Sequence, residues 1–170
     1  MTSYRRFPGT AFLAMVCWLG WPGTALALTA GQQAPDFELH GQSAVPVKLS
    51  SLRGKVVYLD FWASWCGPCR QSFPWMNDMQ AKFAARGFQV VAVNLDAKDA
   101  DAQKFLSETS GKFQIAFDSK GVTPKLYGVK GMPTSYLIDR EGRVVSEHAG
   151  FNLSKTGELE KQIEKALDNK

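Results

Sequence analysis

Cysteine and histidine, the residues that build most metal sites and disulfide frameworks, are scarce in this sequence. Its 170 residues include three cysteines and two histidines. Cys66 and Cys69 lie close together, whereas His40 and His148 lie far from them and from each other. A zinc site built on the cysteine pair needs two further ligands at suitable spacing, so we expect no metal site. Disulfide scaffolds are rich in cysteine, and this class is excluded as well.

Clusters of basic residues are also missing. The formal net charge is +4, and no stretch interleaves arginine with aromatic residues in the manner typical of nucleic-acid binding. Hydrophobic residues make up 45% of the chain and charged residues 21%, as in ordinary globular proteins. The length is sufficient for one domain with a sizeable core. The absence of a basic cluster predicts that the protein does not bind nucleic acid. We also expect a monomer.

Charge is entirely absent from residues 7–35, which follow two adjacent arginines. An apolar stretch and the small-residue cleavage signal Ala-Leu-Ala at 25–27 complete the layout of a secretory signal peptide. We expect residues 1–27 to be removed, together with Cys17, leaving a domain at residues 28–170. The alternative is an uncleaved membrane anchor, since the uncharged stretch is long enough to span a bilayer. In either case the domain is exported, which predicts a periplasmic protein.

The remaining two cysteines follow directly on an apolar, β-branched and aromatic stretch at 55–62. This order predicts a strand that runs into a helix, with Cys66 at the exposed start of the helix and Cys69 one turn inside. The free N–H groups and partial positive charge of a helix N-terminus favour a thiolate, which is the nucleophile in disulfide exchange. A purely structural disulfide is a poor explanation, because closing so short a loop removes little chain entropy. We predict that Cys66 attacks a disulfide and that Cys69 resolves the mixed disulfide.

Strand and helix patterns alternate along the rest of the chain, which indicates an α/β domain with a mixed sheet. We expect the first two strands to form an N-terminal hairpin and the last two to form another around a turn at 139–142. Ser154 is the predicted cap of the last helix. The expected strands are 36–39, 45–49, 55–62, 88–95, 115–117, 134–138 and 143–147, and the expected helices are 67–86, 99–109, 124–127 and a final one near the C-terminus.

The string Trp-Cys-Gly-Pro-Cys at 65–69 resembles the active site of thioredoxins. With Ala-Pro-Asp-Phe-Glu-Leu at 34–39 and Gly-Met-Pro-Thr at 131–134, the sequence resembles the exported TlpA-like branch of the thioredoxin family. The resemblance implies a thioredoxin fold with an N-terminal β-hairpin and an inserted strand-helix unit, which residues 97–117 can supply. It also implies a thiol–disulfide oxidoreductase whose only redox group is the Cys66–Cys69 disulfide, with no further cofactor.

The same resemblance implies roles for residues around the cysteines. Pro133 matches the cis-proline of the family, which exposes the backbone of Met132 to an extended substrate. Asp60 lies where thioredoxins carry a buried carboxyl; burial should raise its pKa and let it exchange protons with Cys69. The alternative for Asp60 is a structural carboxyl bonded to backbone groups. We expect a partner to contact Trp65, which would form an exposed apolar lip, and Gly67, Pro68, Met132 and Pro133.

Two positions depart from the family pattern. Many TlpA-like proteins carry Glu three residues after the second cysteine, where this chain has Ser72. Thioredoxins usually place Lys near the buried Asp on the next strand, where our alignment places Ala92. We therefore expect proton transfer to depend on Asp60 alone.

The expected function is reduction of disulfides in exported proteins, with a membrane electron donor that re-reduces the dithiol. The dipeptide between the cysteines is that of thioredoxin, which favours a reductant. A disulfide-forming oxidase of the same fold and a copper-handling assembly factor, which would bind the metal through its dithiol, are the alternatives. A peroxiredoxin is disfavoured, because its Pro-x-x-x-Thr-x-x-Cys loop is missing. Apocytochrome c, the copper site of a respiratory oxidase, and general disulfide repair are the partners or roles that the family implies.

Overall fold

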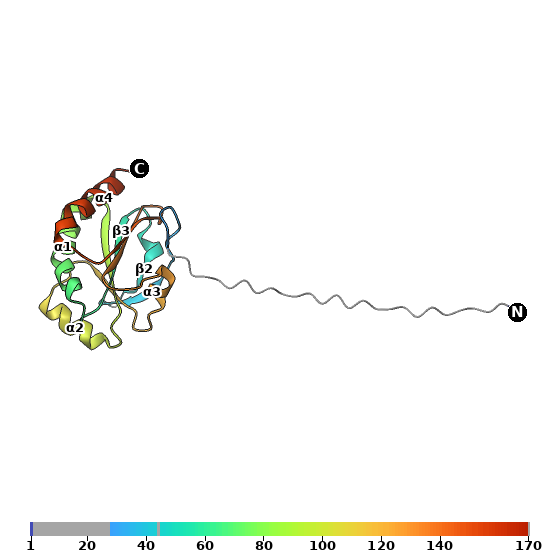
Figure 1. Cartoon of the computed structure of the whole chain (residues 1–170), viewed down its shortest axis with the longest axis horizontal. Helices are drawn as coiled ribbons and strands as arrows, with labels where there is room; N and C mark the ends of the chain where they lie inside the picture. The colour runs from blue at the N-terminus through green and yellow to red at the C-terminus, as the bar shows by residue number, and fades with distance from the viewer. Residues whose placement is uncertain (2–27, 44, 170) are drawn as a thin grey trace.

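The computed structural model describes Met1, residues 28–43 and residues 45–169. The predicted signal peptide or anchor, and Cys17 within it, fall almost entirely on residues 2–27 and lie outside the described residues. No helix among the described residues is long and apolar enough to cross a membrane. In Figure 1 the described domain is a central sheet with α1 and α4 on one side and α3 on the other.

Strands and helices alternate as the sequence predicts, with small shifts at the ends of the elements. The strands are β1 (Glu38–Gly41), β2 (Val47–Lys48), β3 (Val56–Trp62), β4 (Phe88–Asn94), β5 (Gln114–Phe117), β6 (Thr134–Ile138) and β7 (Val144–Ala149). The α-helices are α1 (Gly67–Phe83), α2 (Asp99–Glu108), α3 (Val122–Tyr127) and α4 (Thr156–Asp168), and the 3₁₀ turns are η1 (Leu49–Leu52), η2 (Ala84–Arg86) and η3 (Leu153–Lys155).

The strands form one mixed sheet in the order β2-β1-β5-β4-β3-β6-β7. The central strand β3 pairs in parallel with β4 and antiparallel with β6. The N-terminal hairpin of β1 and β2 is confirmed, and β1 continues the sheet through antiparallel pairing with β5. The inserted unit, α2 followed by β5, therefore joins the N-terminal hairpin to the rest of the sheet. The expected α/β architecture with a mixed sheet is confirmed.

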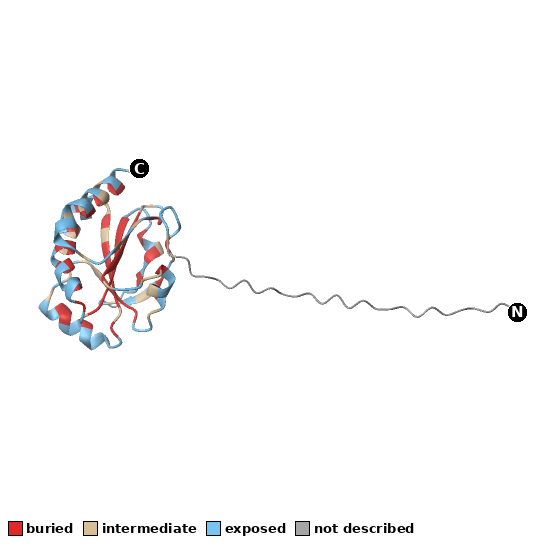
Figure 2. Cartoon of the chain, viewed as in Figure 1, coloured by how far each residue is buried: buried red, intermediate tan, exposed pale blue. Residues whose placement is uncertain are grey.

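All residues of β3 are buried, and their side chains alternate between the two faces of the sheet. Tyr58 and Trp62 pack in the hydrophobic cluster under α1 and α4. Phe61 packs in the cluster on the other face, which includes Tyr127 of α3. Figure 2 shows the buried strands enclosed by helices with exposed outer faces. Because Asp60 lies two residues from both Tyr58 and Trp62, its side chain is on the α1 side of the sheet.

The predicted cap of the last helix is wrong. The turn η3 (Leu153–Lys155) precedes α4, and its capping side chain is that of Asn152. The Asn152 Oδ1 atom accepts hydrogen bonds from the backbone N–H and the hydroxyl of Ser154, both at 2.9 Å. Ser154 lies inside this turn, so its hydroxyl donates to the cap instead of accepting from the helix.

The start of the described domain is fastened to the beginning of the edge strand β7. The Gly31 N–H donates to the Val144 carbonyl and the Val144 N–H donates to the Gln32 carbonyl, both at 2.8 Å. At its other end β7 pairs with β6 through Ala149 and Thr134. The N-terminal segment is therefore attached at the end of β7 that is opposite Thr134.

Candidate active site

Cys66 and Cys69 are joined by a disulfide at the start of α1. The helix begins at Gly67, Cys66 is its N-cap residue, and Cys69 lies in its first turn. The backbone N–H of Cys69 donates to the Cys66 Sγ atom at 3.2 Å, so this sulfur occupies the position of a capping oxygen. The strand-to-helix placement expected from the sequence is confirmed.

The two sulfurs differ in access. Cys66 keeps 5% of its surface exposed and Cys69 none, so a partner can reach the pair only through Cys66. Cys66 is less exposed than the open helix start that the sequence predicts, because its sulfur turns inward to bond with Cys69. The exposed neighbours are Gly67, Pro68 and Trp65, the last of which is 73% exposed.

The loop before β6 lies at the same end of the sheet as the cysteines. The Met132–Pro133 peptide bond is cis. The strands β3 and β6 are antiparallel neighbours, and Phe61 near the end of β3 lies opposite Thr134 at the start of β6. The segment from β3 to Cys66 and the segment from Pro133 into β6 are therefore at the same end of the sheet. Met132 is half-buried and packs against the hydrophobic cluster that contains both cysteines.

Hydrogen bonds fix this loop from both sides. The Gly150 N–H donates to the Pro133 carbonyl at 2.7 Å, and the Thr134 hydroxyl donates to the Gly131 carbonyl at 2.7 Å. Among the described residues, neither backbone group of Met132 has a backbone partner. A groove of about 270 Å³ follows the loop and is lined by Gly128, Lys130, Gly131, Met132, Pro133, Thr134, Glu147, Ala149 and Gly150.

Asp60 is a buried carboxyl, with 2% of its surface exposed. It lies in register with Ala92 on β4 and Ser135 on β6, so the alignment that places Ala92 beside it is confirmed. Its Oδ2 atom has no hydrogen-bond partner among the described residues. Loss of hydration raises the pKa of the Asp60 carboxyl well above its usual range. The site thus favours a protonated Asp60 on the face of the sheet that carries the cysteines.

Ser135 and Tyr58 form a hydroxyl pair near this carboxyl that the sequence did not indicate. The two oxygens are 2.7 Å apart and buried, and burial together with the charge of Asp60 raises the pKa of Tyr58. Ser72 is also buried and donates to the Cys69 carbonyl at 2.9 Å. Since serine does not titrate, Ser72 cannot supply the proton-accepting group that a glutamate would provide there.

A second buried carboxyl that sequence reasoning missed is Asp96. It follows β4 and bonds to Ser64 in the turn that precedes Cys66. The signal in the sequence was available: both residues follow neighbouring parallel strands, and the ends of such strands meet at one edge of the sheet.

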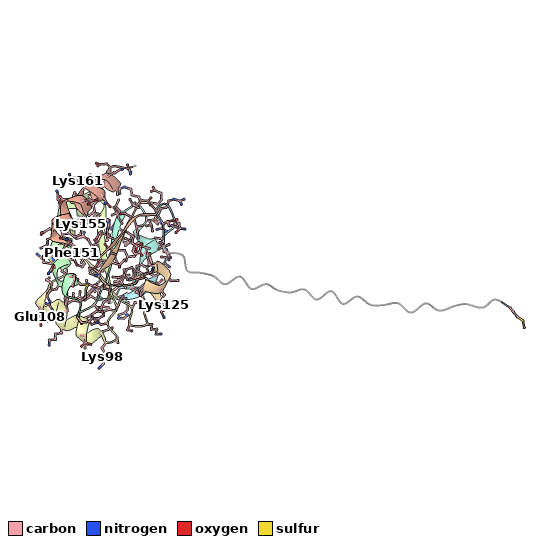
Figure 3. All side chains as sticks on the ribbon, in the orientation of Figure 1. Lys98, Glu108, Lys125, Phe151, Lys155 and Lys161 are labelled. Atoms are coloured by element: carbon pink, nitrogen blue, oxygen red, sulfur yellow. A yellow bond between two sulfur atoms is a disulfide. The ribbon has the colours of Figure 1, made fainter. Side chains whose placement is uncertain are left out.

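The histidines lie apart from this site. His40 bonds to Asp99 at 2.9 Å on the surface, and His148 bonds to Gln162 at 3.0 Å. Within residues 28–43 and 45–169, no group of three or more His, Cys, Asp and Glu side chains is placed to hold a metal. Figure 3 labels four lysines that lie at different places around the domain: Lys98, Lys125, Lys155 and Lys161.

Comparisons with known proteins agree with this arrangement. Residues 30–147 match the model of the AhpC/TSA family. The thiol-disulfide oxidoreductase ResA of Bacillus thuringiensis subsp. konkukian is 34% identical over 135 residues, which cover 79% of this chain and 77% of that protein. ResA of Bacillus subtilis is 31% identical over 162 residues, which cover 86% and 90%.

Solved structures show the same fold. A crystal structure of a protein from Chlorobium tepidum, provisionally named thiol:disulfide interchange protein DsbE, superposes with a TM-score of 0.81 at 64% identity. The match covers 83% of this chain and 99% of that one. The chain therefore belongs to the AhpC/TSA family and, within it, to the thioredoxin-fold thiol–disulfide oxidoreductases.

Proposed function

We propose that this oxidoreductase is an exported reductase of disulfides in other exported proteins. The observation that carries the proposal is the Cys66–Cys69 pair, with thioredoxin's Gly-Pro between the cysteines, at a helix start beside the cis Met132–Pro133 loop. Export rests on the leader-like pattern of residues 1–27. A membrane donor must then return the electrons, because the periplasm is kept oxidising.

The reaction is a two-step transfer of two electrons. The Cys66 thiolate attacks one sulfur of the substrate disulfide, the substrate S–S bond breaks, and one substrate thiolate leaves. Cys69 then loses its proton and attacks the Cys66 Sγ atom, which releases the second substrate thiolate and closes the Cys66–Cys69 disulfide. The substrate gains two electrons and the protein loses two. The complete burial of Cys69 restricts it to this second step.

Asp60 is the proposed proton acceptor for Cys69. Burial raises the pKa of this carboxyl, which makes its ionised form a stronger base toward the Cys69 thiol than an exposed aspartate would be. It lies on the sheet face against which α1 packs, and Ala92 and Ser72 place no competing titratable group at the two family positions beside it. Proton transfer from the Cys69 thiol to the Asp60 carboxylate neutralises the carboxylate and forms the Cys69 thiolate that attacks the mixed disulfide.

The partner is proposed to bind as an extended chain. The backbone groups of Met132 lack partners in the described fold, so they can pair with a substrate strand. Trp65, the residue before Cys66, adds an exposed apolar surface, and aromatic residues of this kind are frequent anchors in interfaces. The exposed Gly67 and Pro68 leave the approach to Cys66 free of bulky side chains.

The environment of Cys66 supports the reducing direction. A strong oxidant such as DsbA, near about −120 mV, stabilises its reduced thiolate far more than thioredoxin does, near about −270 mV. This gap of roughly 150 mV corresponds to about 7 kcal/mol. Here the nearest cation in the chain, Arg70, is held on the inserted unit by Glu108 at 3.3 Å and Thr109 at 3.0 Å. Its guanidinium is thus paired with acceptors of the inserted unit, and it makes no hydrogen bond to either cysteine among the described residues.

The redox potential tests the direction. Equilibration of the purified domain with glutathione buffers should give a potential below about −200 mV. A value above about −150 mV would place the protein with the oxidases. Tight, stoichiometric Cu(I) binding by the reduced protein, combined with negligible reduction of insulin, would instead support the copper-handling alternative.

The physiological partner can be trapped. Cys69→Ala leaves Cys66 able to attack but removes the resolving thiol, so mixed disulfides should accumulate in cells and can be identified by mass spectrometry. Cys66→Ser, which keeps Cys69, is the matched control and should trap nothing. Equal trapping by both variants would show that the assigned roles of the two cysteines are wrong.

A further inference from the structure

A small buried network joins the turn before Cys66 to the end of β4. The Asp96 Oδ2 atom accepts the backbone N–H of Ser64 at 2.9 Å, and Oδ1 accepts the Ser64 hydroxyl at 3.0 Å. The Asn94 side-chain amide donates to the same Oδ2 at 2.7 Å, and its carbonyl oxygen accepts the Asp96 N–H at 3.0 Å. Asn94 is fully buried and Asp96 is 4% exposed.

This network requires a carboxylate at position 96. Three donors converge on its two oxygens: two from Ser64 and one from Asn94. An asparagine offers one acceptor oxygen, so at least one buried donor would lose its partner or face an amide N–H. Leaving a buried donor unpaired costs more than the hydrogen bond itself contributes.

The turn held by Asp96 carries the two residues that meet a partner. Its backbone closes through the Cys66 N–H and the Ala63 carbonyl at 3.1 Å. Trp65 lies between Ser64 and Cys66 in the chain and is 73% exposed. Ser64 is the residue that bonds to the Asp96 carboxylate. Because the Trp65 side chain is largely exposed, the direction of this segment depends on its hydrogen bonds, which are those of Ser64 and the Cys66–Ala63 bond.

We propose that Asp96 is a positioning residue for disulfide exchange: through Ser64 it fixes the turn that aims Trp65 and Cys66 at a protein partner. The inference rests on exchange at Cys66 and applies to either direction of electron flow. A partner protein must match both the indole and the sulfur, whereas a small disulfide needs the sulfur alone. Misplacement of the turn should therefore slow exchange with proteins far more than exchange with small disulfides.

The test compares two rate constants for each folded variant, one for reduction of insulin and one for reduction of glutathione disulfide. Ser64→Ala removes the hydroxyl while the Asp96 charge stays in place, so it isolates geometry from charge. We expect its rate with insulin to fall about tenfold and its rate with glutathione disulfide to change by less than about twofold. Ser64→Thr keeps the hydroxyl and should retain the wild-type rate with insulin.

Asp96→Asn should lower the rate with insulin at least as much as Ser64→Ala. The double variant should be no slower than Asp96→Asn, because both changes break one network. Asp118→Asn is the matched control. Asp118 is a buried carboxyl one strand further along the same edge, where its side chain accepts the Thr123 N–H at 2.6 Å. Only its backbone N–H, which the substitution keeps, bonds to Asn94. Its variant should keep both rates.

Three outcomes would overturn the proposal: an unchanged insulin rate in folded Ser64→Ala, equal losses with both substrates, or the same loss in Asp118→Asn. A wild-type protein that fails to reduce insulin would contradict the reductase proposal instead. In that case the same comparison is made in reverse, with the oxidised protein acting on a reduced peptide and on glutathione.

Discussion

Asp60 places an acid in an otherwise apolar strand, without a hydrogen-bond partner for its Oδ2 atom among the described residues. Burial raises its folded-state pKa above the unfolded value near 3.9. Between these two values the folded protein binds one proton more than the unfolded chain. Stability must therefore fall as pH rises through this window and level off above the folded-state pKa.

Asp60→Ala should remove this pH dependence. The free energy of unfolding of the variant minus that of the wild type should grow as the pH rises from 4 to 8, because only the wild type loses the stability contributed by the extra bound proton. Denaturant titrations at each pH measure it. Ser72→Ala, which removes a buried group that does not titrate, is the control, and its difference from wild type should stay constant. A flat difference for Asp60→Ala would mean that the carboxyl is hydrated in solution.

Asp60→Asn should slow the second step of exchange and leave the first step intact. The amide cannot accept the Cys69 proton, and general-base catalysis typically contributes about 10²- to 10⁴-fold. Stopped-flow mixing with a disulfide peptide should show normal formation of the mixed disulfide and slow release of the peptide. Release that is as fast as in the wild type from pH 6 to pH 9 would assign Asp60 a structural role.

Some residues of the site could be predicted from the sequence and others could not, and the difference has a physical reason. Cys66, Cys69 and Pro133 belong to short motifs in which neighbours along the chain carry the signal. Asp60 was recognisable because a carboxyl in a buried strand is costly. Ser135 pairs with Tyr58 on the neighbouring strand β3, and Asp96 bonds to Ser64 in the turn that follows β3. Both contacts follow from the order and register of the strands, so no short motif in the sequence carries them.

The side chain of Arg140 links the end of the 3₁₀ turn η2, the end of α4 and the turn before β3. The Arg140 guanidinium donates to the carbonyls of Gly54, Arg86 and Leu167 at 2.7, 3.1 and 3.2 Å. The latter two carbonyls lie at the ends of η2 and α4, where backbone acceptors lack intrahelical partners. The planar, five-donor guanidinium suits such a junction better than a lysine ammonium.

Arg140→Ala should lower the free energy of unfolding by about 1–3 kcal/mol, because three charge-assisted hydrogen bonds are lost at a partly hydrated site. Arg140→Lys should recover only part of the free energy of unfolding that Arg140→Ala loses. Exchange activity should be unchanged, since Arg140 lies at the end of the sheet opposite the disulfide. Lys161→Ala, an exposed lysine on α4, should change stability by less than about 0.5 kcal/mol. Equal losses of stability in Arg140→Ala and Lys161→Ala would show that the three hydrogen bonds of Arg140 do not stabilise the fold.

Elements were predictable where hydrophobic periodicity is long and uninterrupted, as in β3, β4 and α1. Their ends were less so. The last helix begins later than a serine cap suggests, because the Asn152 side chain captures Ser154 within a separate turn. Both residues are good caps, and only the geometry of the preceding chain decides between them.

For the whole molecule, the processing of the N-terminus is the open expectation. Intact-mass measurement of protein recovered from the periplasm should give a chain that begins at or near Leu28 and lacks Cys17. A membrane-bound form that retains residues 1–27 would support the anchor. A variant with large residues at positions 25 and 27 should block cleavage and serves as the anchored reference.

The attachment of the N-terminal segment to β7 determines what such an anchor would permit. Only residues 28–30 separate the leader from the first bond to β7, a tether of about 10 Å when extended. The six residues of β7 span roughly 20 Å, which is the distance along the sheet from this attachment to the end that holds the disulfide. With so short a tether, an anchored domain would hold the disulfide end of its sheet away from the lipid. A cleaved domain can instead tumble and present that end to a donor embedded in the bilayer, so the uncleavable variant should accumulate in its oxidised form in cells.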